Sequence, residues 1–292
     1  MTINRKRSDF RCISRMRVRW AEVDMQKIVF NAHYLMYFDT AMADYWRALA
    51  LPYEAAMHHL GGDVYLKKAS VEYFASARYD EQIEIGMRCA RVGNSSLVFE
   101  GAVFRGNETL VTGDLIYVYA DPATQKSQPV PAALRSVFEG FESGQAMVSV
   151  ELGDMATLRA KVDPLRQTVF VQEQGIDAKM VWDEADASAL HAVLVNHLGQ
   201  PVGSGRLLQH APQVARIGRM AVDQVLRGGN WGKTVLSALM DAARARGDTS
   251  VILHAQCTAQ GFYERLGFKT HGSVFQEAGI DHVEMSKSLE KA

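Results

Sequence analysis

The sequence predicts an α+β protein of two domains, residues 1–144 and 145–292. Three observations support this prediction. The 292 residues are about twice the usual length of a domain. The first half reads as one strand, one long apolar helix and four further strands. The second half begins a new pattern after a short, polar, turn-forming stretch, Glu142-Ser143-Gly144-Gln145.

Composition and charge are those of an ordinary globular protein. Hydrophobic residues make up 48% of the chain, enough for two cores, and the formal net charge is -1. A charge this close to zero argues against nucleic acid as the main partner. No long apolar segment or secretion signal occurs, so we expect no membrane span and a cytoplasmic location.

Cysteine and histidine usage points to neither disulfides nor a metal. Cys12, Cys89 and Cys257 are isolated, which predicts free thiols in a reducing compartment. The histidines lack the spacings typical of metal ligands, so no metal is expected. The N-terminal basic residues predict a solvated arm that leads into an edge strand: Arg5, Lys6, Arg7, Arg11, Arg15, Arg17 and Arg19.

A long buried helix is the central element of the first half. It is expected to follow Asn31 and to end before Pro52. Apolar side chains at three- and four-residue spacings cover more than half of its circumference, which indicates a helix enclosed by a curved sheet. These side chains are Tyr34, Leu35, Phe38, Ala41, Met42, Tyr45, Trp46 and Leu49.

The strands of the first half follow from period-2 alternation and β-branched residues. In the segment 83–92, Ile83, Ile85, Met87 and Cys89 alternate with polar or small residues, which indicates a sheet with one buried face. The dipeptides Gly93-Asn94 and Gly106-Asn107 predict antiparallel hairpins between the last three strands. The expected strands are 14–20, 64–74, 83–92, 97–105 and 110–119, and a short helix is expected at 132–141.

A candidate site precedes the long helix. Asp24 lies in the loop before the expected N-cap, Asn31. The first N–H groups of a helix carry partial positive charge and can polarise a carbonyl, which a nearby carboxylate would then face. The same pattern also fits a turn residue followed by an ordinary cap.

This stretch resembles a known active-site loop. Residues 24–34, D-M-Q-K-I-V-F-N-A-H-Y, resemble the pattern D-x-x-G-I-V-[YF]-x-x-x-Y of the 4-hydroxybenzoyl-CoA thioesterase group of hotdog-fold proteins, the YbgC/FadM type. Residues 71–83 resemble a second motif of the group, and the resemblance covers about residues 12–141. Lys27 replaces the usual Gly, His33 a common Asn, and Ser76 a common Pro.

The resemblance implies a hotdog fold, an antiparallel sheet wrapped round the long helix, that hydrolyses acyl-CoA thioesters. It implies that Asp24 is the catalytic carboxylate, as general base or as nucleophile, and that the main-chain N–H near Asn31 polarises the thioester carbonyl. It also implies a homo-oligomer formed through the sheet edges, with active sites between subunits.

In the second half, a strand at 217–222 is followed by a Gly-rich loop, R-G-G-N-W-G at 227–232, and an amphipathic helix at 233–246. A loop and helix N-terminus of this kind can bind an anion such as phosphate, although a Gly-rich loop also simply turns the chain. A strand at 251–255, a short helix at 256–266 and a strand from Gly267 are expected next. Earlier, a strand at 147–152 and a mainly helical segment at 154–170 are expected.

These segments resemble the GNAT N-acetyltransferases of the ElaA-type branch over about residues 146–289. The loop at 227–232 corresponds to their [QR]-x-x-G-x-[GA] acyl-CoA loop, with Asn230 in place of the central Gly. The element N-x-x-A-x-x-x-Y-x-x-x-G-F corresponds to Gln256, Ala259, Tyr263, Gly267 and Phe268. Further matches are L-R-x-x-V-F-V-x-E-Q from Leu165, R-L-L from Arg206, G-R-M-A-V from Gly218 and G-I-D-H-V-E-M from Gly279.

The resemblance implies a GNAT fold, a mixed sheet with flanking helices, and roles for named residues. Tyr263 would donate a proton to the departing CoA thiolate, unless it is only a packed aromatic. The base for the amine is open among Glu173, His254 and Glu264. Main chain at Met220, Ala221 and Val222 would pair with pantetheine, and the pyrophosphate would be held by Arg227, Gly228, Gly229, Asn230, Gly232 and Lys233.

The leading hypothesis is a bifunctional enzyme, an acyl-CoA thioesterase followed by a GNAT acyltransferase. It binds no cofactor permanently and takes CoA or acyl-CoA as substrate or donor. In a second hypothesis, prompted by Asn230, the GNAT half is a degenerate acyl-CoA-binding or oligomer-stabilising module that regulates the thioesterase. In a third, the chain is a scaffold without catalysis. The acyl group and the amine acceptor stay open.

Overall fold

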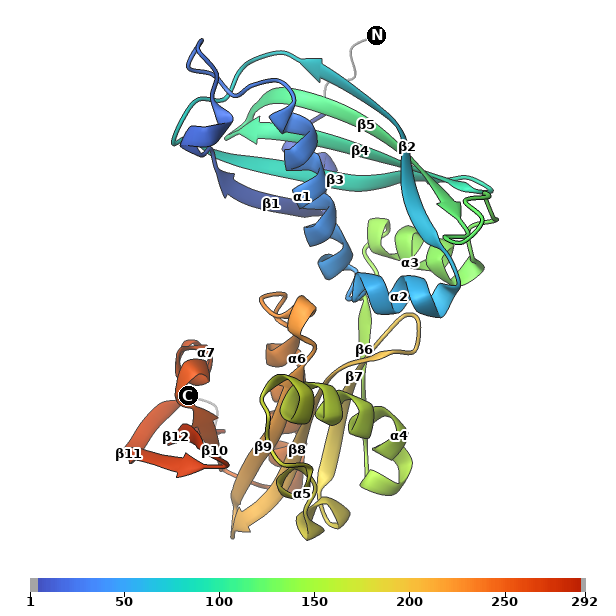
Figure 1. Cartoon of the computed structure of the whole chain (residues 1–292). Helices are drawn as coiled ribbons and strands as arrows, with labels where there is room; N and C mark the ends of the chain where they lie inside the picture. The colour runs from blue at the N-terminus through green and yellow to red at the C-terminus, as the bar shows by residue number, and fades with distance from the viewer. Residues whose placement is uncertain (1–4, 290–292) are drawn as a thin grey trace. The chain divides into compact units, whose positions relative to one another are not determined.

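The computed structural model describes residues 5–289, and the chain divides into two compact units, Met1–Met147 and Val148–Ala292. Unit 1 runs from blue to green and unit 2 from green to red in Figure 1. The α+β class is confirmed, because a five-stranded antiparallel sheet and a seven-stranded mixed sheet each carry helices. Within residues 5–289, no helix is long and apolar enough to cross a membrane.

Unit 1 has the expected order of one strand, a long helix, four strands and a short helix, with one further helix at Tyr53–Leu60 that was not predicted. Its sheet has the strand order β1-β3-β4-β5-β2, so β1 and β2 are the edges. The elements are β1 (Cys12–Arg17), α1 (His33–Ala48), α2 (Tyr53–Leu60), β2 (Asp63–Tyr73), β3 (Gln82–Val92), β4 (Ser96–Arg105), β5 (Glu108–Ala120) and α3 (Ala132–Glu142). Single 3-10 turns lie at Arg7–Asp9 and Trp20–Glu22.

Helix α1 lies across one face of this sheet (Figure 1). Most of the predicted face is buried, including Phe38, Ala41 and Tyr45 at 0% exposure. Leu35 was predicted to be buried and is 38% exposed. Leu35 lies in the first turn of α1 beside Met36, which is 51% exposed. The buried face of α1 is therefore narrower in its first turn than the apolar spacing predicts. Tyr37, outside the predicted set, is buried instead.

Two facing glycines let α1 approach the sheet closely. Gly101 on β4 pairs with Gly113 on β5, and a Cβ on either would lie 2.6 Å from the ring of Phe38. On the same pair, Arg5 donates to the carbonyl oxygens of Gly101 at 3.2 Å and Gly113 at 2.9 Å. Arg5 is only 3% exposed, so the prediction of a solvated basic arm is wrong at this residue. Buried carbonyls and Asp114 bind its guanidinium instead.

The first strand also ends earlier than expected. Residues 14–20 were predicted to be extended, but β1 ends at Arg17 and a 3-10 turn begins at Trp20. The carboxylate of Glu22 accepts the main-chain N–H of Arg19 at 2.7 Å, which closes this turn. A local side chain to main chain bond of this kind competes with strand pairing.

Unit 2 contains a sheet of order β11-β12-β10-β9-β8-β7-β6, in which β9 and β10 are parallel and the other neighbours antiparallel. Its strands are β6 (Val148–Gly153), β7 (Leu190–Asn196), β8 (Pro201–Ala211), β9 (Val214–Val222), β10 (Ser250–Gln256), β11 (Lys269–Glu277) and β12 (Ile280–Ser288). Its helices are α4 (Met155–Arg166), α5 (Ala178–Val181), α6 (Trp231–Arg246) and α7 (Gln260–Arg265). Short 3-10 turns lie at Glu184–Ala187, Gln224–Leu226 and Cys257–Ala259.

Helices cover both faces of this sheet. On β7, Ala192 and Leu194 belong to the core beneath α6, whereas Val193 and Val195 pack against α4. Successive side chains of a strand point to opposite faces, so the two helices lie on opposite sides. The predicted inner face of α6 is confirmed, because its five predicted residues are buried: Val235, Leu236, Leu239, Met240 and Ala243.

The helical segment predicted at 154–170 is not uniformly α-helical. Helix α4 contains Pro164 and passes at Gln167–Glu173 into a π-helix. Proline has no N–H to donate to the preceding turn, and such a gap in the α-helical hydrogen bonds favours a local change of helix type. The π-helical turn brings Gln174 to the cavities described below.

Candidate functional site

Asp24 lies in a tight hairpin between the Trp20–Glu22 turn and α1. Its main-chain N–H donates to Ile28 O at 2.9 Å, and its carbonyl oxygen accepts the N–H of Lys27 at 2.9 Å. One carboxylate oxygen accepts the N–H of Gln26 at 2.8 Å. The side chain of Asp24 is half-buried. The hairpin therefore fixes the carboxylate while leaving part of it open to a ligand.

The unusual residue of this loop, Lys27, keeps a glycine-like conformation. Its φ is 63°, in the left-handed region that glycine adopts without steric cost. The pattern that the loop resembles has Gly at this position. Replacing Gly with Lys therefore leaves a strained residue here.

We expect Lys27→Gly to stabilise unit 1 by about 0.5–1 kcal/mol, because relief of the left-handed strain outweighs the extra entropy of glycine in the unfolded chain. The midpoint of urea unfolding of unit 1 measures this change. Lys126→Gly is the matched control, because Lys126 is also an exposed loop residue of unit 1 but has no positive φ. An equal shift in both variants would contradict the explanation.

Asn31 does not cap α1 as predicted. The N-cap is Ala32, without a side-chain hydrogen bond, and the helix begins at His33. The chain enters the helix through a backbone turn in which the N–H of His33 donates to Phe30 O at 2.9 Å. Asn31 O accepts the N–H of Tyr34 at 3.3 Å and the hydroxyl of Tyr73 at 3.2 Å. Within residues 5–289, neither the N–H of Asn31 nor that of Ala32 has an acceptor, so both are available to a carbonyl oxygen.

The sequence interpretation missed Glu22, which connects the loop to α1. Glu22 is 3% exposed, accepts the hydroxyl of Tyr37 at 2.8 Å, and its carbonyl oxygen accepts the N–H of Phe30 at 2.9 Å. Desolvation opposes ionisation of Glu22, but the bonds from Arg19 and Tyr37 outweigh it and lower its pKa. The spacing of Arg19 and Glu22, three residues apart, is the sequence signal that could have identified this contact.

In unit 2, most of the predicted CoA-binding residues line one cavity of about 700 Å³. Gly229 does not line the cavity; a Cβ there would lie 2.6 Å from Nε1 of Trp231, so the indole packs beneath the loop. The other predicted residues all line it: Met220, Ala221, Val222, Arg227, Gly228, Asn230, Gly232, Lys233 and Tyr263.

The loop of this cavity keeps the conformation that glycines would favour. Gly228 has φ 88° and Asn230 has φ 67°, directly before α6. Asparagine tolerates the left-handed region better than most residues, so it can replace the central glycine. The guanidinium of Arg227 is held by Glu173 through two bonds of 2.5 and 2.6 Å. Lys233 is exposed and has no ion-pair partner in the described part of the chain, so it is available to an anion.

The cavity opens where β9 and β10 separate. The two strands pair only where Ser250–Ile252 lie opposite residues 214–216. Within residues 5–289, β9 has no strand partner on the side of β10 from Ile217 to Val222. Main-chain groups of Met220–Val222 on that side therefore have no strand partner in the described chain and can pair with an extended ligand, although Val222 O accepts the Nε–H of Arg227 at 3.2 Å.

A second cavity, of about 190 Å³, adjoins the first. Met220, Ala259 and Tyr263 line both, together with Gln174 and Gln256. Tyr263 is 7% exposed, and burial raises the pKa of its hydroxyl to about 12. The hydroxyl therefore stays protonated at neutral pH. Because Tyr263 lines both cavities, it lies where they meet.

Of the three candidate bases, only His254 lines either cavity. Its Nδ1 lies 2.8 Å from a carboxylate oxygen of Glu277 and 3.0 Å from Nη2 of Arg216. Glu173 is occupied by Arg227, and Glu264 accepts the side-chain amide of Gln260 at 2.8 Å. Contacts with His254 lower the pKa of Glu277 against the opposing effect of desolvation. Among residues 5–289, no cluster of three or more metal-ligating side chains occurs.

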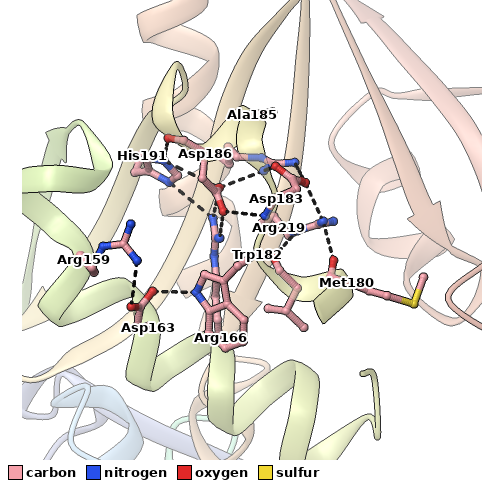
Figure 2. A network of polar contacts seen from close by, with 12 residues as sticks. Arg159, Asp163, Arg166, Met180, Trp182, Asp183, Ala185, Asp186, His191 and Arg219 are labelled. Carbon is pink, nitrogen blue, oxygen red and sulfur yellow. Dashed lines mark hydrogen bonds and ion pairs between the residues drawn. The ribbon is translucent and has the colours of Figure 1, made fainter. Parts of the chain in front are cut away.

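A buried charge network lies beside the smaller cavity (Figure 2). Arg166, 1% exposed, binds Asp186 through bonds of 2.7 and 3.0 Å. Arg206 binds Asp183 at 2.6 Å and Asp186 at 2.8 Å, and Arg219 binds Asp183 at 3.0 Å. The three arginines belong to the quoted GNAT-like motifs, but nothing in the sequence pairs them with these aspartates.

Comparison with known proteins agrees with this geometry in both units. The model of the acetyltransferase (GNAT) domain matches residues 161–289, and that of the thioesterase superfamily matches residues 26–112. The thioesterase match begins just after Asp24, so it does not include the candidate carboxylate.

Relatives of each unit are found separately. The uncharacterized protein YyaT of Bacillus subtilis (strain 168) is 34% identical over 44% of this chain and 86% of its own length. The uncharacterized N-acetyltransferase YjcF of the same organism is 32% identical over 42% of this chain and 87% of its own length. The acyl-CoA thioester hydrolase YbgC of Escherichia coli O6:H1 is 26% identical over 42% of this chain and 92% of its own length. The chain therefore belongs to the GNAT acetyltransferase family through unit 2 and carries a hotdog domain of the thioesterase superfamily as unit 1.

Proposed function

We propose that unit 2 transfers an acyl group from a CoA thioester in the larger cavity to an amine in the smaller one. The meeting of the two cavities at Tyr263 carries this proposal. Pantetheine pairs with the free edge of β9 at Met220–Val222, and the pyrophosphate lies at the loop and Lys233. The carbonyl carbon then lies between the amine and Tyr263, as transfer requires.

His254 and Tyr263 divide the proton transfers. His254, held by Glu277, takes a proton from the ammonium group so that its nitrogen can attack the thioester carbonyl. The C–N bond forms and the C–S bond breaks, and Tyr263 gives its proton to the departing thiolate. A hydroxyl whose pKa is raised to about 12 retains its proton until the thiolate forms.

We expect Tyr263→Phe to lower kcat for acyl transfer by roughly 10²-fold or more, since it removes the proton donor and keeps the packed ring. Amine-dependent release of CoA, with the acylated product identified by mass, measures this. Hydrolysis of thioesters by unit 1 is the internal control and should not change. Equal transfer rates in both proteins would leave Tyr263 a packing residue.

The ion pair of Arg227 with Glu173 favours a second candidate, in which unit 2 binds acyl-CoA without transferring the acyl group. In this case the pyrophosphate contacts fall to the loop N–H groups and Lys233 alone. Measurable CoA binding without transfer to any amine in a broad mixture would support this candidate.

For unit 1, we propose hydrolysis of an acyl-CoA thioester. The thioester oxygen accepts the free N–H groups of Asn31 and Ala32, and Asp24 acts as general base toward water or as nucleophile. A thiolate is a good leaving group, so this pair of features suffices without a Ser-His arrangement.

We also propose that unit 1 pairs with a second copy along β2. This strand is an edge of the sheet, and most of its side chains are exposed. Leu66, Tyr73 and Phe74 are 52%, 51% and 47% exposed on it or just after it. An unpaired edge with exposed apolar groups favours strand addition. Light scattering at rising protein concentration tests the pairing, and a monomer at every concentration contradicts it.

A further inference from the structure

The smaller cavity is lined by an arginine, Arg216, that forms no ion pair within hydrogen-bond distance among the residues that the structure describes. Arg206, Arg216 and Arg219 all line it. Arg206 binds two aspartates, and Arg219 binds Asp183 and the carbonyl oxygens of residues 180 and 181. Within residues 5–289, Arg216 has no carboxylate in direct contact, although its charge helps to lower the pKa of the nearby Glu277. Its recorded polar contact is Nδ1 of His254 at 3.0 Å.

Arg216 and the proposed base lie side by side. Arg216 on β9 and Ile252 on β10 form the last pair before the two strands separate. His254 follows Ile252 by two residues on β10. Glu277 contacts the same nitrogen of His254, and Glu284 lies 3.8 Å from the other ring nitrogen. The carboxylates near this end of the cavity are thus directed to the histidine. Arg216 is left to bind an anionic group of a ligand.

This arrangement restricts the class of acceptor. A proton acceptor beside a guanidinium that has no direct carboxylate contact within the described chain fits a molecule that carries an amine and a carboxylate on one carbon atom. A polyamine would bring further positive charge against Arg216, which is unfavourable in a partly buried site. The volume of about 190 Å³ is also below the range of about 300–1,000 Å³ typical of pockets for larger ligands, so the acceptor is small.

We propose that the acceptor of unit 2 is a free α-amino acid, with its carboxylate on Arg216 and its amino group at His254. This rests on the acyl transfer proposed above. The ammonium group loses two protons as the amide forms. One passes through His254 to solvent, and the other replaces the proton that Tyr263 gives to the CoA thiolate. The products are an N-acylamino acid and free CoA.

The first test compares acceptors that differ only at the carboxylate. A mixture of the standard amino acids and a matched mixture of amino acid amides are offered with acetyl-CoA, and acylated products are identified by mass. We expect the acids to be acylated with a kcat/KM roughly 10- to 100-fold above that of the amides, as for loss of one charged hydrogen-bonding partner. Arg216→Gln should remove this preference, and Arg244→Gln, a surface control, should not. Equal use of acids and amides overturns the proposal.

The second test does not need catalysis. Saturation-transfer NMR compares binding of N-acetylamino acids and N-acetylamino acid amides to the full chain in the presence of CoA. Selective binding of the acids that Arg216→Gln removes supports the proposal even if no amine is acylated, in which case only the transfer function fails. Equal binding of acids and amides, or binding of neither, overturns it. The comparison on the unchanged protein stands even if Arg216→Gln does not fold.

Discussion

The Asp24→Asn protein is expected to lose thioester hydrolysis, with kcat for free-thiol release from acyl-CoA esters falling by roughly 10²- to 10⁴-fold. The amide keeps the size of the side chain, and its oxygen can still accept the N–H of Gln26, so the hairpin should persist. What it lacks is the ability to take a proton from water or to attack the carbonyl. Thiol release in the absence of any amine, from aryl, short-chain and medium-chain esters, measures the loss.

Two controls separate chemistry from folding. Met25→Ala changes the adjacent, fully exposed side chain and should leave hydrolysis intact. Amine-dependent acyl transfer by unit 2 should be equal in both variants. If Asp24→Asn hydrolyses as fast as the unchanged protein, the proposed role of Asp24 is wrong, and unit 1 has the hotdog fold without this mechanism.

The Asp186→Asn protein is expected to lose about 3–5 kcal/mol of the stability of unit 2. Asp186 is 5% exposed and binds both Arg166 and Arg206. Among the described residues, removing its charge leaves Arg166 without its carboxylate partner and leaves Arg206 with Asp183. Hydrogen exchange of peptides from β7 and β8 at rising denaturant concentration measures the change within unit 2.

The same group gives a pH dependence of defined sign. Desolvation alone would raise the pKa of Asp186, but bonds and charge from Arg166 and Arg206 outweigh it and hold the pKa at about 2. Its unfolded value is about 3.9, so this stabilisation is complete above that pH and is lost as pH falls toward 2. Asp186→Asn should lose this part of the acid sensitivity.

Asp241→Asn is the matched control for Asp186→Asn. Asp241 pairs with Arg244 three residues later on the surface of α6, at 72% exposure of the aspartate. A pair this exposed contributes about 0–1 kcal/mol, because water and salt screen it. Similar losses in the two variants would mean that the buried network does not contribute more than a surface pair.

The strands of unit 1 and helices α1 and α6 were predictable because their apolar residues follow one period over many residues, whereas α2, β7 and β8 were not predicted. Helix α6 shows this, since its five predicted inward residues are buried. Two errors at the start of α1 and the end of β1 occur where a local polar contact replaces the regular pattern. Glu22 ends the extended segment early, and the backbone turn at Phe30 replaces a cap by Asn31. Neither contact changes hydrophobic periodicity, so periodicity could not reveal them.

The candidate sites were predictable only where their residues follow one another in the chain. The loop at Arg227–Lys233 and Tyr263 could be identified from short motifs that resemble those of GNAT acetyltransferases. The choice of His254 among three possible bases required the cavity, and the pairing of Arg166 with Asp186 required the fold of a segment between two motifs. Contacts between residues far apart in sequence have no local signal in a single chain.

The separation of β9 and β10 makes the proposed donor a structural part of unit 2. Two strands that part within a sheet leave main-chain groups without partners, as at an outer edge. If pantetheine binds in this gap as proposed, it would act as an added strand, and its binding energy would add to the stability of the folded unit. Stability then grows with the logarithm of the free CoA ester concentration, by about 2.7 kcal/mol at 100 times the dissociation constant. The lifetime of the folded chain in a cell would therefore follow the supply of its own substrate.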